Sequence, residues 1–423
     1  MTNAMAQVHR RSIAPCMRMA LAVCALFGLS ACVVETRPVD RVNAVQATTE
    51  IAESQLLDVG VQLLDPNVPE DEKVQEELKI FPDVRKAESR YMPMRLRSTL
   101  EGTGHWGQVR VVPMEENSLD VMVSGKILES SGMTLKLEFT VRDASGRTWF
   151  TKVYQAPADT RSYRDTSGRP RDPFQNLYSE VANDMLAARQ KLVAGDLESI
   201  RRVSDLRFAS DLAPYAFKDY LKQDRKGIYQ VQRLPAEGDP LPARIQLIRE
   251  RDYAFVDTLN EHYALFSDNV AEPYQNWRRY SYDEIEQETA AKRSAMNRKL
   301  LGAAAIIAGV VAGANSETYV GSAAATAGII GGVYAVKSGF DKAAEAKMHS
   351  DSLKQLGQSF QAEVQPMVVE VEGRTLQLTG TAEEQFHEWR RLLKELYENE
   401  TGIPVAAPDA VAGQGSEGSA ARR

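Results

Sequence analysis

The chain has 423 residues and a formal net charge of −7, with 43% hydrophobic and 26% charged residues. A length well beyond one ordinary core predicts two or three structural units, and the acidic balance excludes a basic surface for nucleic acid. All three cysteines lie at or before Cys32. This excludes a thiolate metal site, a cysteine nucleophile and a disulfide from everything that follows.

Residues 1–31 have the layout of a secretory signal peptide, in which three arginines precede an apolar run ending at Leu29. The tetrapeptide Leu29-Ser30-Ala31-Cys32 resembles the lipobox of bacterial lipoproteins. That resemblance implies cleavage before Cys32 and attachment of lipid, palmitate included, to this cysteine. In that family an aspartate after the cysteine marks retention at the inner membrane, so Val33 implies a periplasm-facing protein of the outer membrane. The alternative is an ordinary signal peptide with an incidental cysteine.

A polar tether is predicted over residues 32–54, followed by an α+β domain over 55–195. The first strand of this domain is indicated by the alternation of apolar residues from Leu57 to Leu63. A helix is expected over residues 84–100, where Pro93 either kinks it or starts a second short helix.

Four further strands are expected in quick succession, and short glycine-containing turns make the last three an antiparallel meander. Their ranges are 106–112, 119–128, 135–141 and 148–154. A helix over residues 174–192 follows, with Asp172 as its N-cap and Pro173 at its first position. This order predicts an α+β fold with a mainly antiparallel sheet and covering helices.

The order of these elements, with the segments 95–100 and 106–113, is similar to the small α/β domains of envelope auxiliary lipoproteins. It resembles the curli-secretion lipoprotein family more distantly. The resemblance covers about residues 55–192. It implies a class of protein and no individual functional residue, because none of the family motifs is sharp enough to transfer one.

Helical structure is predicted on both sides of an apolar segment. A paired-helix module over 196–298 is indicated by apolar residues that recur every three or four positions from Ile245 to Tyr263. Residues 341–401 are expected to form a polar helix and a β-β-α module with strands at 368–371 and 375–378. Its last helix opens with a capping box of Thr381 and Glu384 and carries four apolar residues on one face: Phe386, Trp389, Leu393 and Leu396. Residues 402–423 are predicted to be a disordered tail.

The apolar segment 299–340 is predicted to be a glycine-zipper helical hairpin with arms at 300–314 and 320–336. Its glycines are spaced four and seven apart, so that they share a helix face suited to close packing. They are Gly302, Gly309, Gly313, Gly321, Gly328 and Gly332. An arm of about 22 Å is shorter than the roughly 30 Å hydrocarbon core, which favours packing with other copies or dipping into one leaflet. A buried Ala/Gly-rich helix pair inside a soluble domain remains the alternative.

Two surfaces are candidates for partner contact. One is an arginine-rich loop with Arg161, Arg164, Arg169 and Arg171, which suits lipid phosphate or an acidic partner and is otherwise a solvated loop. The other is an aromatic group that suits stacking on a partner or, alternatively, helix packing. It contains Tyr274, Trp277, Tyr280 and Tyr282, interleaved with Arg278 and Arg279.

No catalytic constellation emerges, because the histidines at 105, 262, 349 and 387 are isolated and none has zinc-ligand spacing. We therefore predict no cofactor beyond the covalent lipid and no enzymatic activity. The first hypothesis is a lipid-anchored, non-enzymatic assembly or transport-accessory scaffold with an envelope protein partner and a tendency to homo-oligomerise. The second is a subunit of an oligomeric outer-membrane pore or secretion channel, and the third is an enzyme acting on envelope glycan or lipid.

Overall fold

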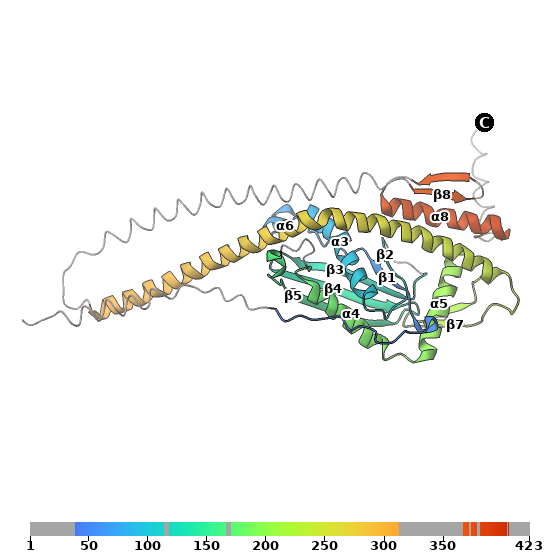
Figure 1. The fold of residues 1–423 in the computed structure, drawn as a ribbon, viewed down its shortest axis with the longest axis horizontal. Helices are drawn as coiled ribbons and strands as arrows, with labels where there is room; N and C mark the ends of the chain where they lie inside the picture. Colours follow the sequence, from blue (N-terminus) through green and yellow to red (C-terminus); the bar gives the residue numbers. More distant parts are fainter. Residues whose placement is uncertain are drawn as a thin grey trace, which may run out of the picture. The chain divides into compact units, whose positions relative to one another are not determined.

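The computed structural model describes residues 39–113, 118–165, 171–312, 367–371, 374–378, 381–403 and 405. The chain divides into two units, Met1–Val39 and Asp40–Arg423, and the fold described below belongs to the second. The predicted α+β class is confirmed, since a five-stranded sheet with covering helices is followed by a long helix and a C-terminal helix (Figure 1). Cys32 and the residues of the predicted signal peptide lie outside the described residues.

The sheet has the strand order β2-β1-β3-β4-β5. Its strands are β1 (Val59–Gln62), β2 (Val109–Val112), β3 (Val121–Ser130), β4 (Thr134–Asp143) and β5 (Thr148–Pro157). The antiparallel meander of β3, β4 and β5 is confirmed, and its two ladders are the longest in the sheet. Strand β1 runs parallel to both β2 and β3, because helical chain between β1 and β2 supplies the crossover that a parallel pair needs.

Four helices belong to this part of the chain: α2 (Glu72–Glu77), α3 (Pro82–Glu101), α4 (Gln175–Arg189) and α5 (Ala194–Leu212). Helix α3 continues through Pro93 as one helix. The alternative in which a second short helix starts at Pro93 is therefore wrong. The predicted N-cap of α4 is wrong. The cap position is Phe174. The Asp172 carboxylate accepts the backbone N–H of Phe174 at 2.8 Å through Oδ1, and its Oδ2 accepts from side chains of the interior.

Helix α6 (Leu241–Ala312) is a single helix of 72 residues. It follows α5 and a short hairpin of β6 (Leu221–Gln223) and β7 (Tyr229–Val231). The predicted apolar face is confirmed, because Ile248, Leu259 and Tyr263 are fully buried. This face packs against α3, α5 and β2, so the segments predicted as a domain at 55–195 and a module at 196–298 share one hydrophobic core.

The apolar segment is described only in part. Gly302 and Gly309 lie within α6, whereas Gly313, Gly321, Gly328, Gly332 and the predicted turn at 315–317 lie outside the described residues. Within the part of the chain that is described, none of the helices has the length and apolar run needed to cross a bilayer.

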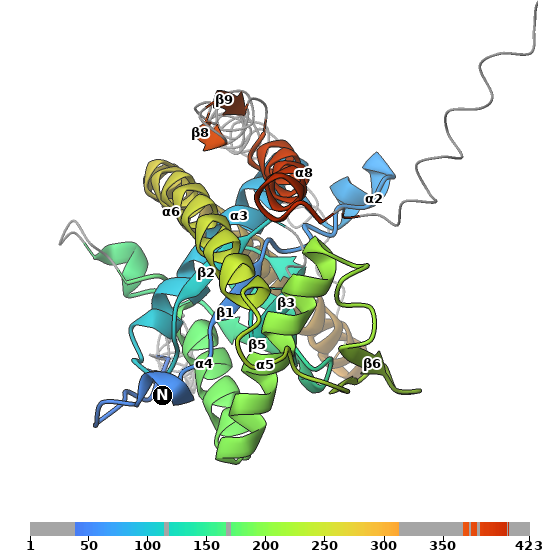
Figure 2. The same cartoon turned by 90° about the vertical axis from the view of Figure 1, so that its right-hand side faces the viewer.

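The C-terminal β-β-α order is confirmed by β8 (Met367–Val371), β9 (Arg374–Leu378) and α8 (Ala382–Thr401). The capping box is present, with Thr381 Oγ1 accepting from the N–H of Glu384 and the Glu384 carboxylate accepting from the N–H of Thr381. The four apolar residues expected on one face of α8 are all buried. Figure 2 shows α8 beside the first part of α6, where Trp389 Nε1 donates to Asp252 at 3.0 Å. The predicted helix before this module lies outside the described residues, as does nearly all of the predicted tail.

Part of the predicted tether is bound to the domain. From Asp40 to Val45 the chain exchanges hydrogen bonds with α4, whose Asn176 and Asn183 side chains accept from the N–H groups of Val42 and Val45. The 3-10 turn η1 (Glu53–Gln55) follows. The segment therefore joins the folded body well before residue 54.

Candidate functional site

A groove with a cavity volume of about 970 Å³ lies between α2, the start of α3, the end of β3 and α6. This volume is at the upper end of the range of ligand pockets. Trp277 and Tyr280, which the sequence predicted as partner contacts, both line it. We refer to it as the α6 groove.

The α6 groove combines apolar walls with an acidic rim. Leu78, Ile80, Phe81 and Leu128 provide apolar surface, and the Leu78 side chain remains 63% exposed. The rim carries four carboxylates and two basic residues: Glu72, Glu76, Glu129, Glu284, Lys79 and Arg85. Both bases are paired with acids, Lys79 with Glu284 at 3.7 Å and Arg85 with the buried Glu88 at 3.7 Å. The groove therefore has a surplus of negative charge and suits a basic, apolar partner.

One wall of the α6 groove is the end of a strand. Strand β1 pairs with β3 only from Val121 to Val123, and an isolated bridge joins Asp65 to Lys126. Among the described residues, no strand covers Leu128–Ser130 on the β1 side. Uncovered strand backbone next to a groove is the arrangement that accepts an extended peptide by β-augmentation.

Some aromatic residues of α6 are packed inside the domain, and one is better placed in the α6 groove. Trp277 is only 4% exposed, stacks on Tyr274 with ring centres 5.9 Å apart and meets the edge of Phe81 at 6.2 Å. Helix packing, the alternative that the sequence left open, therefore holds for Trp277 and Tyr274. Tyr280 is half-buried and lines the groove, which makes it the member of the group best placed for a partner.

A buried ion pair lies next to these aromatic residues. Arg278 of α6 is 0% exposed, and its Nη1 donates to Asp172 Oδ2 at 3.0 Å. Burial opposes ionisation of Asp172, but the charges of Arg278 and Arg95 hold the pKa of its carboxyl below the usual value. The same neighbourhood raises the pKa of Tyr91 to about 12, chiefly through burial and then through the charge of Asp172. The guanidinium thus remains charged inside the protein.

Aromatic rings surround the part of Arg278 that has no hydrogen bond. Its Nε and Nη2 find no acceptor among the described residues, whereas the guanidinium lies 4.0 Å from the centre of the Tyr274 ring and 5.0 Å from that of Phe174. Cation–π contacts in a desolvated site contribute about 2 kcal/mol. Nearby, Glu88 accepts from the Tyr274 hydroxyl at 2.6 Å and from Ser130 at 2.5 Å. These contacts link α6 to α3 and β3 beneath the groove.

Two arginines of the arginine-rich loop are bound by the protein itself. Arg161 binds Asp159 through Nε at 2.7 Å, and Arg171 donates to the carbonyl of Val42. Arg164 lies in the 3-10 turn η2 (Ser162–Arg164), and Arg169 is outside the described residues. The turn instead packs against α6, where the Tyr163 and Tyr282 rings lie 5.8 Å apart. The two predicted surfaces are thus neighbours, which sequence separation concealed.

A second buried polar cluster joins α6 to α5 and β2. The Arg249 guanidinium binds Asp205, the Ser118 carbonyl and, at 2.8 Å, Ser204 Oγ. Farther along α6, the Asn260 amide both donates to and accepts from the Val111 backbone, at 2.9 and 2.7 Å. The Asn260 side chain therefore satisfies the backbone of Val111 at the outer edge of β2. Helix α6 covers this edge, which would otherwise be open to pairing with another strand.

Asp120, in this second cluster, predicts a pH dependence of stability. Burial raises the pKa of its carboxyl to about 6, against the opposing effects of the Asp58 N–H and Arg249. Because the folded-state pKa lies above the unfolded one, the folded state binds the proton more tightly and loses stability as pH rises. Between about pH 4.5 and pH 6.5 we expect this group to remove about 2 kcal/mol.

The measurement is urea unfolding of the wild type and Asp120→Asn at both pH values. The asparagine keeps an acceptor for the Asp58 N–H, whose bond to Asp120 Oδ2 is 3.0 Å, but it does not titrate. The difference in stability between the two proteins should therefore shift by about 2 kcal/mol in favour of the variant at the higher pH. A difference independent of pH would contradict the prediction.

The described residues contain no cluster of three or more histidine, cysteine, aspartate or glutamate side chains arranged to hold a metal ion. No protein-family model matches the chain, and no curated protein or solved structure matches it significantly.

Proposed function

We propose that the protein is a lipid-anchored, non-enzymatic scaffold of the bacterial envelope that binds a partner protein in the α6 groove. One observation carries this proposal. The helix that lines the groove at Trp277–Ile285 continues without a break to Ala312 and contains Gly302 and Gly309. From Ile285 to Ala312 this is a further length of about 40 Å. A partner held in the groove is thereby linked by one stiff helix to the glycine-rich segment.

The partner chemistry follows from the walls of the groove. Exposed apolar surface at Leu78, the acidic rim and the uncovered backbone of Leu128–Ser130 favour an extended segment with alternating apolar and basic residues. The backbone of such a segment would pair with β3, and its basic side chains would face Glu76 and Glu129.

The anchor sets how far this body reaches from the membrane. In the proposal, lipid on Cys32 holds the chain at the outer membrane and the body faces the periplasm. The stretch from Cys32 to Asp40 spans at most about 28 Å when fully extended, and from Asp40 onward the chain is bound to α4. The body would therefore stay close to the membrane surface.

Lipidation is tested directly by labelling. Radiolabelled palmitate fed to expressing bacteria should enter the wild-type protein and remain absent from Cys32→Ala, because the lipid is attached through that cysteine. Cys24→Ala, which alters a cysteine of the signal segment, serves as the matched control and should incorporate label normally. An unlabelled wild-type protein at equal expression would overturn the lipid-anchor proposal.

Partner binding is tested by placing a photo-crosslinking residue at Leu78 in the full chain. Leu265, also exposed (61% against 63%) but outside the groove, is the matched control position. We expect a discrete adduct with another envelope protein from position 78 only. Reversing rim charges with Glu76→Lys and Glu129→Lys should reduce that adduct about fivefold, because a basic partner segment would then be repelled. Equal adducts from both positions would contradict the groove as the binding site.

A pore or secretion-channel subunit is the second candidate, favoured by Gly302 and Gly309, which share a face of α6 at a spacing of seven. A channel subunit should form a ring-sized, detergent-dependent oligomer that disappears when residues 300–336 are deleted. A scaffold should keep its Leu78 adduct in the deleted protein. Persistence of the adduct without an oligomer favours the scaffold, and loss of a ring-sized oligomer favours the channel.

A further inference from the structure

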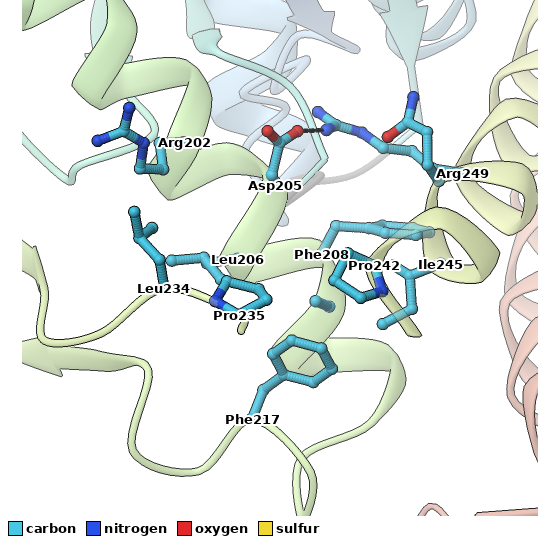
Figure 3. A pocket seen from close by; sticks show the side chains of 12 residues that line it. Arg202, Asp205, Leu206, Phe208, Phe217, Leu234, Pro235, Pro242, Ile245 and Arg249 are labelled. Atoms are coloured by element: carbon cyan, nitrogen blue, oxygen red, sulfur yellow. Dashed lines mark hydrogen bonds and ion pairs between the residues drawn. The ribbon is translucent and has the colours of Figure 1, made fainter. Parts of the chain in front are cut away.

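A second cavity lies far along α6 from the groove, where the helix begins. Its volume is about 210 Å³, and α5, the loop around Leu234 and the start of α6 enclose it. Figure 3 shows apolar side chains around the space: Leu206, Phe208, Phe217, Leu234, Pro235 and Ile245. A cavity of about 150 Å³ accepts benzene, so this one accommodates a group of ring size or slightly larger.

Charge is confined to one edge of this cavity. There the Arg249 guanidinium binds Asp205, and Arg202 lies on the same edge (Figure 3). Arg249 is only 6% exposed, and its Nε–H has no acceptor among the described residues. Two arginines and one aspartate line the cavity, so its lining carries a net positive charge, while Asp120 interacts with Arg249 from outside the lining. A buried donor without an acceptor, next to an apolar cavity, is a feature that a ligand with an anionic group would satisfy.

We propose that this cavity binds a small amphiphilic carboxylate, with its apolar ring or short chain among Leu206, Phe217 and Leu234 and its carboxylate at Arg249 and Arg202. The ligand is a free small molecule, because a cavity of about 210 Å³ has room for little more than one ring. This site is independent of the proposed partner groove, since the two share no lining residue.

The probe is radiolabelled benzoate, measured by equilibrium dialysis against the purified full chain, with benzamide as the neutral molecule of the same shape. We expect benzoate to bind with a Kd of about 1 mM and benzamide at least about fivefold more weakly, because only the carboxylate meets the arginines. Benzoate that fails to bind below about 10 mM, or that binds no better than benzamide, overturns the proposal.

Paired substitutions locate the site. Leu234 is 52% exposed at the mouth, so Leu234→Glu adds a repelling charge without removing core contacts and should weaken benzoate about fivefold. Leu265→Glu adds the same charge at an exposed position of α6 that does not line the cavity, and it should leave binding unchanged. Asp205→Asn removes the carboxylate that competes for Arg249, and it should tighten benzoate several-fold. General damage to the fold would not tighten binding, and equal effects of the two glutamates would overturn the assignment.

Discussion

Arg278→Met is expected to lower the free energy of unfolding by about 4 kcal/mol, the largest effect of any single substitution considered for this protein. The methionine keeps much of the apolar volume of the arginine, but it leaves the buried Asp172 carboxylate without Arg278 at 3.0 Å and with Arg95, 3.9 Å away, as a weaker charged partner. Asp172 and Arg278 side chains are each only 1% exposed, so water cannot replace the lost partner. The measurement is urea unfolding followed by circular dichroism.

The matched control is Arg279→Met. Arg279 is the next residue on α6, is exposed and, among the described residues, has a 3.4 Å hydrogen bond to Asn276, so its replacement should change stability by less than about 0.5 kcal/mol. A double variant, Asp172→Leu with Arg278→Met, should be more stable than Arg278→Met alone, because both buried charges are then removed. A loss below about 1 kcal/mol in Arg278→Met would contradict a buried, charged pair.

This ion pair explains how a helix as long as α6 is fixed at one position on the domain. Apolar contacts along a helix face tolerate small sliding movements, whereas a buried charge has one acceptable partner position. Asp172 comes from the segment before α4 and Glu88 from α3, so the contacts around Arg278 and Tyr274 place α6 against two elements together. The width of the α6 groove depends on that placement, since Trp277 and Tyr280 lie on either side of Arg278 in sequence.

The sequence predicted those parts of the fold that are determined by local pattern. Short turns with glycine produced the meander β3-β4-β5, and the spacing of Thr381 and Glu384 predicted the start of α8. The parallel pairing of β1 was missed, because it depends on a crossover that local alternation does not encode. The continuity of α6 across the predicted boundary at residues 298 and 299 was also missed, since the change to an apolar composition there resembles a boundary.

The candidate site was predicted only in outline. Tyr280 and Trp277 were recognised as aromatic residues on one helix, but the other walls of the groove come from α2 and β3, far away in sequence. In the sequence, Asp172 is placed to cap a helix. In the structure, one of its carboxylate oxygens accepts from the Phe174 N–H, and the other accepts from Arg278. An aspartate before a helix and an arginine within an aromatic group are each common patterns, and only the fold shows that they meet.

Gly132→Ala is expected to lower the free energy of unfolding by about 3 kcal/mol, at the upper end of the usual cost of overpacking. Gly132 lies in the turn between β3 and β4, against α6. A Cβ at this position would lie 1.9 Å from the Arg278 carbonyl oxygen and 2.3 Å from the Tyr282 nitrogen. Both are backbone atoms of a helix, so rotation of a side chain cannot relieve the contact. The turn or the helix must move.

The movement would reach the contacts that hold the groove together. The Gly132 N–H donates to Ser281 of α6 at 3.2 Å, so separating the turn from the helix weakens this bond. A shift of the turn also disturbs the bond that the Gly132 carbonyl accepts from the Tyr163 hydroxyl of η2 at 2.7 Å. Gly195→Ala is the matched control, because a Cβ at that position in the first turn of α5 meets nothing within 4 Å. It should leave stability unchanged or raise it by up to about 1 kcal/mol.

The two glycines separate two explanations of any loss in stability. Alanine restricts the unfolded chain more than glycine does, and neither glycine has a positive φ, so backbone conformation predicts no loss at either position. Steric contact with α6 predicts a loss at Gly132 alone. If Gly132→Ala also abolishes the photo-crosslink from Leu78 while the protein remains folded, the position of α6 controls the groove. An adduct that persists in a folded Gly132→Ala protein would show that the partner is held by α2 and β3 without α6.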